Sequence, residues 1–189
     1  MVLNPIAQEG TKDVFSDNLN HGIIHMTGEV TDEMAASIIA QLAMLETSGK
    51  DISIYINSPG GSVSAGLAIY DMMQAVAAKG VAVRTICIGR AASMGAVILS
   101  GGTRRVIMPH AEVMIHQPSG GMEGKASDIM VAADHMKTTK SVLNEILSSN
   151  CGKKIEDVSK DTELDHWMNA EEAVDYGIVD SIWGEDGRP

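Results

Sequence analysis

Ser93 is the residue of this chain whose sequence surroundings best suit nucleophilic chemistry. It follows residues 81–88, a run rich in β-branched residues that predicts a buried strand, and precedes an apolar, small-residue run that predicts a helix from Met94. Such a bend raises a serine hydroxyl beside the free N–H groups of the first helical turn. The pattern Ala91-x-Ser93-x-Gly95 is close to the G-x-S-x-G turn. The alternative for Ser93 is an ordinary helix N-cap.

Acyl transfer at a serine needs a base, usually a histidine, and a carboxylate that orients the imidazole. Of the 6 histidines, His116 is best placed. It ends a predicted strand, 112–116, and precedes a Gln-Pro turn and a glycine-rich loop, 117–124. A satisfied structural histidine is the alternative. Asp161 and Asp165 both precede the last predicted helix, and their spacing does not choose between them as the carboxylate.

Acyl transfer also needs N–H donors for the oxyanion that develops on the carbonyl oxygen. Gly60 and Gly61 follow a predicted strand, 51–57, and their lack of side chains allows a backbone N–H to point into a cleft. The N–H of Met94, beside Ser93, is the natural second donor. An ordinary Pro-Gly turn is the alternative for the two glycines.

Predicted strands and helices alternate at the spacing of β-α units, which favours the α/β class. We expect strands at 22–28, 51–57, 81–88, 104–108, 112–116 and 178–183, and helices at 31–46, 64–79, 94–100, 127–149, 155–160 and after Asn169. The polar first 20 residues are expected to be mobile or to be ordered only by neighbours. The helix at 127–149 is too long for one small domain to cover, so we expect part of it to meet another subunit.

Composition predicts one domain with a full hydrophobic core, since 44% of the 189 residues are hydrophobic. The 14 basic and 25 acidic residues give a net charge of −11, which disfavours nucleic acid and anionic membranes as partners. No apolar run reaches the roughly 20 residues of a membrane span, and the first residues lack the pattern of an export signal. Cys87 and Cys151 have no metal-ligand spacing. We therefore expect free thiols, no metal and a cytoplasmic location.

Motifs spread over residues 28–182 carry a resemblance to a known family. They are YINSPGG at 55–61, YDMM at 70–73, TIC at 85–87, AASMGA at 91–96, MIHQP at 114–118 with a glycine pair at 120–121, DTE at 161–163 and EAV-x-YGIVD at 172–180. In these motifs the chain resembles the ClpP family, the serine peptidases of the ATP-dependent Clp system. The resemblance implies the crotonase-like α/β ClpP fold of repeated ββα units. It implies a single domain over 1–189, with an N-terminal axial segment at 1–20 and a protruding handle at about 117–149.

The resemblance also assigns roles by position. It makes Ser93 the nucleophile, His116 the base and Asp165 the orienting carboxylate, because Asp165 follows the DTE motif at the family's spacing. Gly61 and Met94 become the oxyanion donors. It further implies heptameric rings, usually stacked as a tetradecamer around a chamber, with polypeptide substrates. The implied partner is an AAA+ unfoldase that hydrolyses the ATP, so no cofactor is expected in this chain.

The chain departs from the family at two places. Leu164 stands where the family commonly has an arginine that pairs across the contact between rings, so that contact is altered. The pocket that receives the unfoldase loop is usually more aromatic, and its positions here are Ser53, Tyr55, Ile86, Ile88, Val106 and Met108. A smaller, less aromatic pocket should bind a different or weaker anchor.

Three hypotheses of function follow. The favoured one is a serine endopeptidase that hydrolyses unfolded proteins or short peptides through an acyl-enzyme, with an apolar preference beside the cut. A non-catalytic subunit of a mixed ring is disfavoured, because the serine, histidine and aspartate are all present. A crotonase-type acyl-CoA enzyme is disfavoured, because so acidic a chain shows no basic patch for the CoA phosphates. Within the peptidase class, a viral maturation protease stays open.

Overall fold

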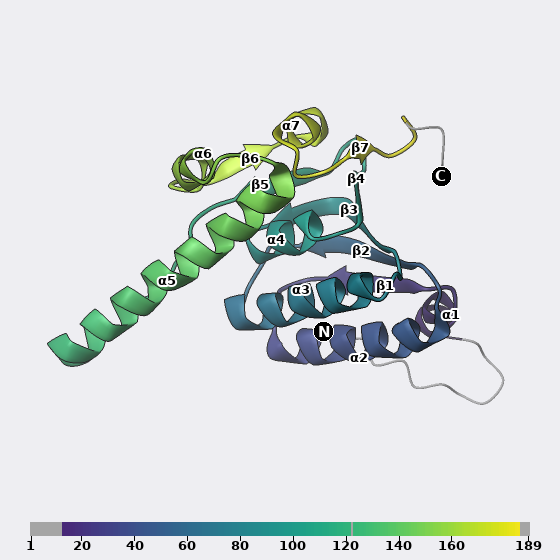
Figure 1. Cartoon of the computed structure of the whole chain (residues 1–189), viewed down its shortest axis with the longest axis horizontal. Coiled ribbons are helices and arrows are strands. Elements are labelled where there is room, and N and C mark those ends of the chain that lie inside the picture. The colour runs from purple at the N-terminus through teal and green to yellow at the C-terminus, as the bar shows by residue number, and fades with distance from the viewer. Residues whose placement is uncertain (1–12, 122, 186–189) are drawn as a thin grey trace.

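A parallel sheet with the strand order β1-β2-β3-β4-β7 runs through the centre of the molecule (Figure 1). The computed structural model describes residues 13–121 and 123–185. The strands of this order are β1 (Ile23–Thr27), β2 (Ile52–Ser58), β3 (Val83–Ala92), β4 (Arg104–Ile107) and β7 (Ser181–Ile182). Strand β5 (Glu112–Ile115) pairs with the last part of β3, and β6 (His166–Met168) pairs antiparallel with β5. The predicted α/β class is confirmed.

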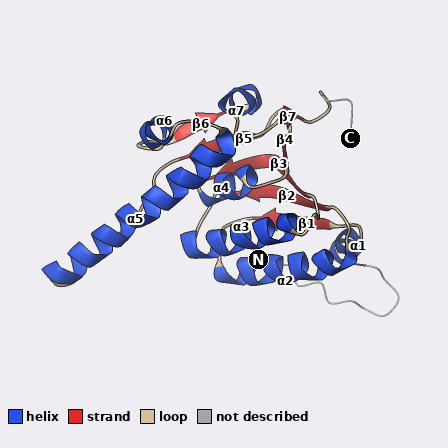
Figure 2. Cartoon of the chain, viewed as in Figure 1, coloured by secondary structure: helices blue, strands red, loops and turns tan. Residues whose placement is uncertain are grey.

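Seven helices surround this sheet in the described part of the chain (Figure 2). They are α1 (Val14–Asn20), α2 (Asp32–Ser48), α3 (Val63–Ala78), α4 (Met94–Ser100), α5 (Ala126–Cys151), α6 (Ile155–Asp161) and α7 (Ala170–Tyr176). Along β2, Ile52, Ile54 and Ile56 are fully buried while the residues between them are more exposed. This period of two places the core between one face of the sheet and helices α2, α3 and α4.

Two predicted helix starts are confirmed by their caps. The Thr31 hydroxyl accepts a hydrogen bond from the N–H of Met34 at the start of α2. At α7, the Asn169 side chain accepts from the N–H of Glu172, and the Glu172 carboxylate accepts from the N–H of Asn169. Each side chain therefore satisfies a backbone donor that has no partner within the helix.

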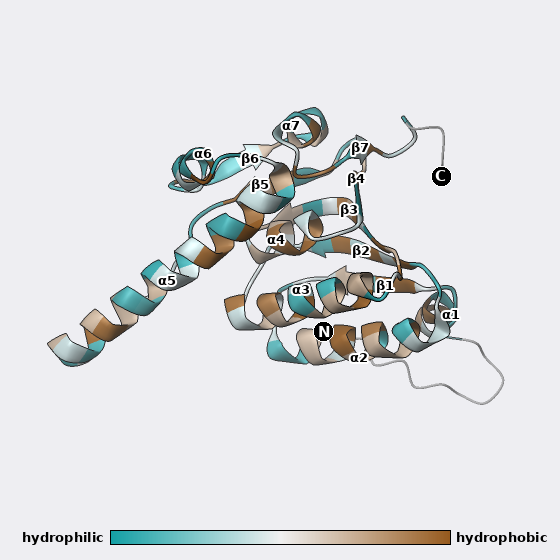
Figure 3. Ribbon diagram, viewed as in Figure 1, coloured by the Kyte–Doolittle hydropathy of each residue, from teal (hydrophilic) through white to brown (hydrophobic). Residues whose placement is uncertain are grey.

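The long helix α5 projects away from the sheet (Figure 1). Its buried residues, Leu143, Asn144 and Leu147, all lie in its C-terminal half. The N-terminal half exposes Ile129, Met130 and Val131, and Figure 3 shows hydrophobic residues along this projecting part. Whether this half meets another subunit stays a prediction. No helix in the described ranges combines the length and the apolar character needed to cross a membrane.

The described part of the first segment is ordered by a neighbour, which is one of the two alternatives that the sequence left open. Residues 14–20 form α1, whose N-cap Asp13 accepts a hydrogen bond from the N–H of Ser16. The helix packs on β1, because the ring of Phe15 meets the ring of His25 edge to face, with their centroids 5.5 Å apart. Residues 1–12, the rest of the expected axial segment, lie outside the described residues.

Two strands differ from their predicted bounds by more than two residues, and one strand was not predicted. Strand β3 extends past 88 to Ala92, because its last residues gain β5 as a partner. Strand β6 was not predicted, since three residues are too few for a periodic pattern. Strand β7 covers only 181–182 of the predicted 178–183, because Ile178 turns back to bond the carbonyl of Ala173 at the end of α7.

Candidate active site

Ser93 lies between β3 and α4 in a strained backbone conformation. Its φ of 54° is the only positive value at a non-glycine residue in the described part of the chain. Such conformations cost about 1–3 kcal/mol and persist where the surroundings hold them. Here the Ser93 N–H donates to the carbonyl of Met114, 2.8 Å away, and the Ser93 carbonyl accepts from the N–H of Ala96. The strained backbone of Ser93 is therefore held by β5 and by the first turn of α4.

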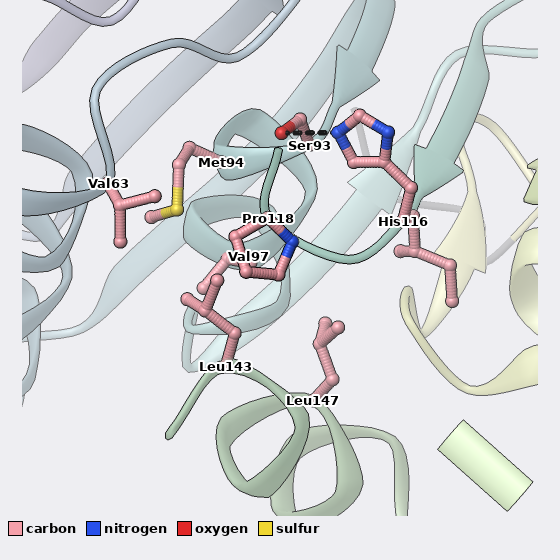
Figure 4. A pocket seen from close by; sticks show the side chains of 9 residues that line it. Val63, Ser93, Met94, Val97, His116, Pro118, Leu143 and Leu147 are labelled. Carbon is pink, nitrogen blue, oxygen red and sulfur yellow. Dashed lines mark hydrogen bonds between the residues drawn. The ribbon is translucent and has the colours of Figure 1, made fainter. Parts of the chain in front are cut away.

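The Ser93 hydroxyl does not cap α4. The residue occupies the N-cap position, but its side chain makes no capping hydrogen bond. Its Oγ instead lies 2.9 Å from Nε2 of His116, and Figure 4 shows the imidazole turned toward the hydroxyl. Ser93 is therefore the N-cap residue of α4 by its backbone position, but its side chain does not act as a cap.

His116 follows β5, and its second ring nitrogen meets Asp165. Nδ1 of His116 lies 2.9 Å from Oδ1 of Asp165. Because an ionised carboxylate can only accept, Nδ1 carries the proton and Nε2 is free to accept from the Ser93 hydroxyl. The β5–β6 ladder pairs Ile115 with His166, which brings the residues flanking each partner side by side. Ser93, His116 and Asp165 thus form one continuous line of contacts.

Asp161, the other carboxylate that sequence spacing left open, has a different partner. Its Oδ2 accepts a hydrogen bond from the Tyr176 hydroxyl, 3.0 Å away. Burial, and after it this hydrogen bond, raises the pKa of Tyr176 above its ordinary value. Asp161 therefore joins α6 to α7, and of the two carboxylates it is Asp165 that contacts His116.

The Gly60–Gly61 turn passes directly beside Ser93. A Cβ atom placed on Gly60 would lie 2.6 Å from the Cβ of Ser93, and φ at Gly60 is 93°. No residue with a side chain fits this position without displacing the turn. The glycine at 60 thus brings a peptide unit against the serine.

Backbone hydrogen bonds to Val30 hold this turn in place. The Val30 N–H donates to the Gly60 carbonyl and the Val30 carbonyl accepts from the Ser62 N–H, both at 2.8 Å. Among the described residues, the N–H groups of Gly61 and Met94 have no acceptor. Both N–H groups are therefore available as donors, and their role in binding an oxyanion stays a prediction.

An apolar pocket opens beside the Ser93–His116 pair (Figure 4). Apart from Ser93 and His116 it is lined by Val63, Met94, Val97, Ile115, Pro118, Leu143 and Leu147. The lining combines α4 with the buried half of α5. No local pattern in the sequence indicated that Leu143 and Leu147 line a pocket at the serine.

The six predicted docking residues share one face of the sheet. Tyr55, Ile86 and Val106 stand in register across β2, β3 and β4. Ser53 and Ile88 lie two positions away on β2 and β3, so side-chain alternation places them on the same face. Met108 follows directly after the end of β4, two positions beyond Val106. Ile86 and Val106 are buried, whereas Ile88 is 38% exposed. Their role in docking stays a prediction.

Both cysteines are free thiols, as expected. Burial raises the pKa of Cys87, in β3, to about 11. Burial also raises the pKa of Cys151, at the end of α5, to about 11. In the described ranges, no group of three or more histidine, cysteine, aspartate or glutamate side chains is arranged to hold a metal ion.

Comparison with known proteins covers this whole site. The family model described as Clp protease matches residues 6–186. The ATP-dependent Clp protease proteolytic subunit of Ligilactobacillus salivarius (strain UCC118) is 50% identical to this chain over 178 residues. That alignment covers 92% of this chain and 89% of the relative. The family match therefore includes every residue of the contact line and of the apolar pocket.

Proposed function

Because this chain belongs to the Clp protease family, we propose that it is a serine endopeptidase and the proteolytic subunit of an ATP-dependent protease. Ser93 is the nucleophile, His116 the base and Asp165 the orienting carboxylate. The observation that carries this proposal is the line of two 2.9 Å contacts that joins Asp165 to His116 and His116 to Ser93. The name of the Ligilactobacillus salivarius relative supports it.

The geometry suits a two-step acyl transfer. Ser93 Oγ attacks the peptide carbonyl carbon while Nε2 of His116 takes the hydroxyl proton. His116 then gives this proton to the leaving amine as the carbon–nitrogen bond breaks, and the acyl group stays on Ser93. A water molecule then attacks the acyl carbon while Nε2 of His116 takes its proton. The bond from the acyl carbon to Ser93 Oγ breaks, Oγ takes the proton back from His116, and the acid is released. Asp165 accepts from Nδ1–H throughout and stabilises the imidazolium, while the N–H groups of Gly61 and Met94 bind the oxyanion.

The apolar pocket supports a preference for an apolar side chain next to the scissile bond. Its wall has no charged residue, so a substrate carboxylate or ammonium group would lose its hydration there without gaining a partner. Medium-sized apolar side chains, such as those of leucine and methionine, bury their surface at no such cost. The enzyme therefore selects by the polarity of one side chain and is otherwise tolerant of sequence.

Val97→Phe is expected to disfavour larger apolar side chains next to the scissile bond. The larger ring would occupy pocket space, so kcat/KM should fall about tenfold for a peptide with leucine at the cut relative to one with alanine. Initial rates on the two matched peptides measure this ratio. Val142→Phe, at an exposed position of α5, should leave it unchanged. An equal loss on both peptides in Val97→Phe would contradict the assigned pocket.

Assembly and partners belong to the same proposal. We propose that the chain forms heptameric rings in the cytoplasm, stacked as a tetradecamer, and receives polypeptides from an AAA+ unfoldase that hydrolyses ATP. The exposed apolar residues of α5 support contact between copies. The words "ATP-dependent" and "subunit" in the relative's name support the partner and the assembly. The chain itself needs no metal or cofactor, because its own side chains supply the nucleophile and the base and its backbone N–H groups supply the oxyanion donors.

The proposal is tested by labelling with a fluorophosphonate, which reacts only with an activated serine. Intact mass should show one adduct per wild-type chain and none in Ser93→Ala or His116→Ala. An adduct on Ser93→Ala would place the nucleophile elsewhere. Absence of an adduct from wild-type protein that forms rings by native mass would favour the non-catalytic subunit.

A further inference from the structure

Gln117, the residue after His116, is fastened to the segment that carries Asp165. Its backbone N–H donates to the carbonyl of Thr162, 2.6 Å away. Its side-chain Nε2 donates to the carbonyl of Glu163 at 2.9 Å. The residue next to His116 is therefore hydrogen-bonded to the segment that leads to Asp165.

Lys140 of α5 joins both sides of this contact. Its Nζ donates to Oε1 of Gln117 at 3.0 Å and to Oε1 of Glu163 at 2.6 Å. Because a lysine ammonium can only donate, it fixes the amide oxygen of Gln117 toward itself and the amide nitrogen toward the Glu163 carbonyl. The Lys140 side chain is only 26% exposed, so this cation is held in place more firmly than a typical surface lysine.

Asp165 needs such support because burial does not hold it. Its side chain is 60% exposed, and the contact that orients it is the one with His116. The segment is anchored at its start, where the buried Thr162 hydroxyl donates to Asn144 of α5, and at its end by the pairing of His166 in β6. The Lys140 contacts fall between these two anchors, directly ahead of Leu164 and Asp165.

We propose that Lys140 is a positioning residue for the His116–Asp165 pair. Acting through Gln117 and Glu163, it keeps the Asp165 carboxylate within hydrogen-bond distance of His116 Nδ1, although it touches neither residue. The role rests on the proposed function, since it matters only where His116 acts as a base. It also makes the alignment of the base depend on how α5 packs.

Lys140→Met keeps the apolar stem and removes the donors. We expect kcat on a short peptide to fall about tenfold with KM within twofold of wild type, because the pocket residues are untouched. The rate of fluorophosphonate labelling should fall by a similar factor. Lys140→Arg keeps the charge and donors, and should recover activity to within about threefold of wild type.

The matched control is Lys137→Met. Lys137 lies on the same helix and pairs with Asp134, and both side chains are largely exposed. This variant removes the same charge from α5 without touching the Asp165 segment, and should keep wild-type kcat and labelling. A fall equal to that of Lys140→Met would attribute the effect to the charge of α5 and overturn the proposal.

A second variant keeps the test independent of folding. Gln117→Ala should lower kcat by a similar factor, and the double variant with Lys140→Met should fall no further than the lower single, since both break one connection. Additive losses of kcat in the double variant would overturn the proposal. So would a Lys140→Arg variant that has wild-type thermal stability but does not recover the kcat lost in Lys140→Met. If wild type and Lys140→Met react with the fluorophosphonate at the same rate, the positioning role of Lys140 alone is overturned. If Ser93→Ala is labelled as wild type is, the proposed function is overturned as well.

Discussion

Ser93→Ala is expected to lower peptide hydrolysis by at least about 10⁴-fold. In the proposed mechanism Ser93 Oγ forms the acyl-enzyme, and the variant removes this atom from its 2.9 Å contact with His116 Nε2. Alanine keeps the Cβ, and the hydroxyl makes no capping bond, so the fold and the assembly should be unchanged. Initial rates on a fluorogenic peptide measure the loss, and the thermal unfolding midpoint checks the fold.

Two further variants show whether the loss belongs to a catalytic unit. His116→Ala should cause a loss of similar order, and combining it with Ser93→Ala should add little, because the two residues act in one step. Ser37→Ala, at an exposed serine of α2, should retain wild-type rates. Turnover by Ser93→Ala within tenfold of wild type would mean that another residue is the nucleophile.

Gly60→Ala is expected to have the largest effect outside the line of contacts from Ser93 to Asp165. The new Cβ would lie 2.6 Å from the Cβ of Ser93 and 2.8 Å from the carbonyl of Ala92, and the φ of 93° disfavours any side chain. The turn must shift, which moves the Gly61 N–H away from the oxyanion. We expect kcat to fall about 10²–10³-fold and the free energy of unfolding to fall by about 2 kcal/mol.

Gly80→Ala separates the effect of backbone strain from the effect of the steric clash with Ser93. Gly80 has nearly the same φ, 87°, but nothing lies within 4 Å of an added Cβ. It should lose stability through backbone strain alone and keep its kcat. If Gly60→Ala behaved like Gly80→Ala in both peptide turnover and thermal unfolding, the Gly60–Gly61 turn would have no part in catalysis.

The local features of the site were predictable from the sequence because they depend on neighbours in the chain. The bend at Ser93 follows from a β-branched run that meets a small-residue run, and the position of His116 follows from the end of a short strand. The choice between Asp161 and Asp165 was different. It depends on the pairing of β5 with β6, and three residues are too few to show a period. Only the family resemblance indicated Asp165.

Features that depend on how α5 packs could not be predicted. The pocket brings Val97 together with Leu143 and Leu147. Lys140 contacts Gln117 and Glu163, each of which is 23 positions away from it in the sequence. Helical periodicity in the sequence predicts which residues of α5 are buried, but not which element they pack against. Similarly, α1 has a short polar sequence, and its order depends on contact with His25 of β1.

The two cysteine thiols bear on how this protein should respond to chemical inhibitors. With a pKa of about 11 for each cysteine, only roughly one thiol in 10⁴ is a thiolate at neutral pH, and the thiolate is the reactive form. Alkylating agents and mild oxidants that act on cysteine peptidases therefore find almost no target here. Electrophilic inhibitors directed at the proposed nucleophile Ser93 should therefore meet little competition from Cys87 or Cys151.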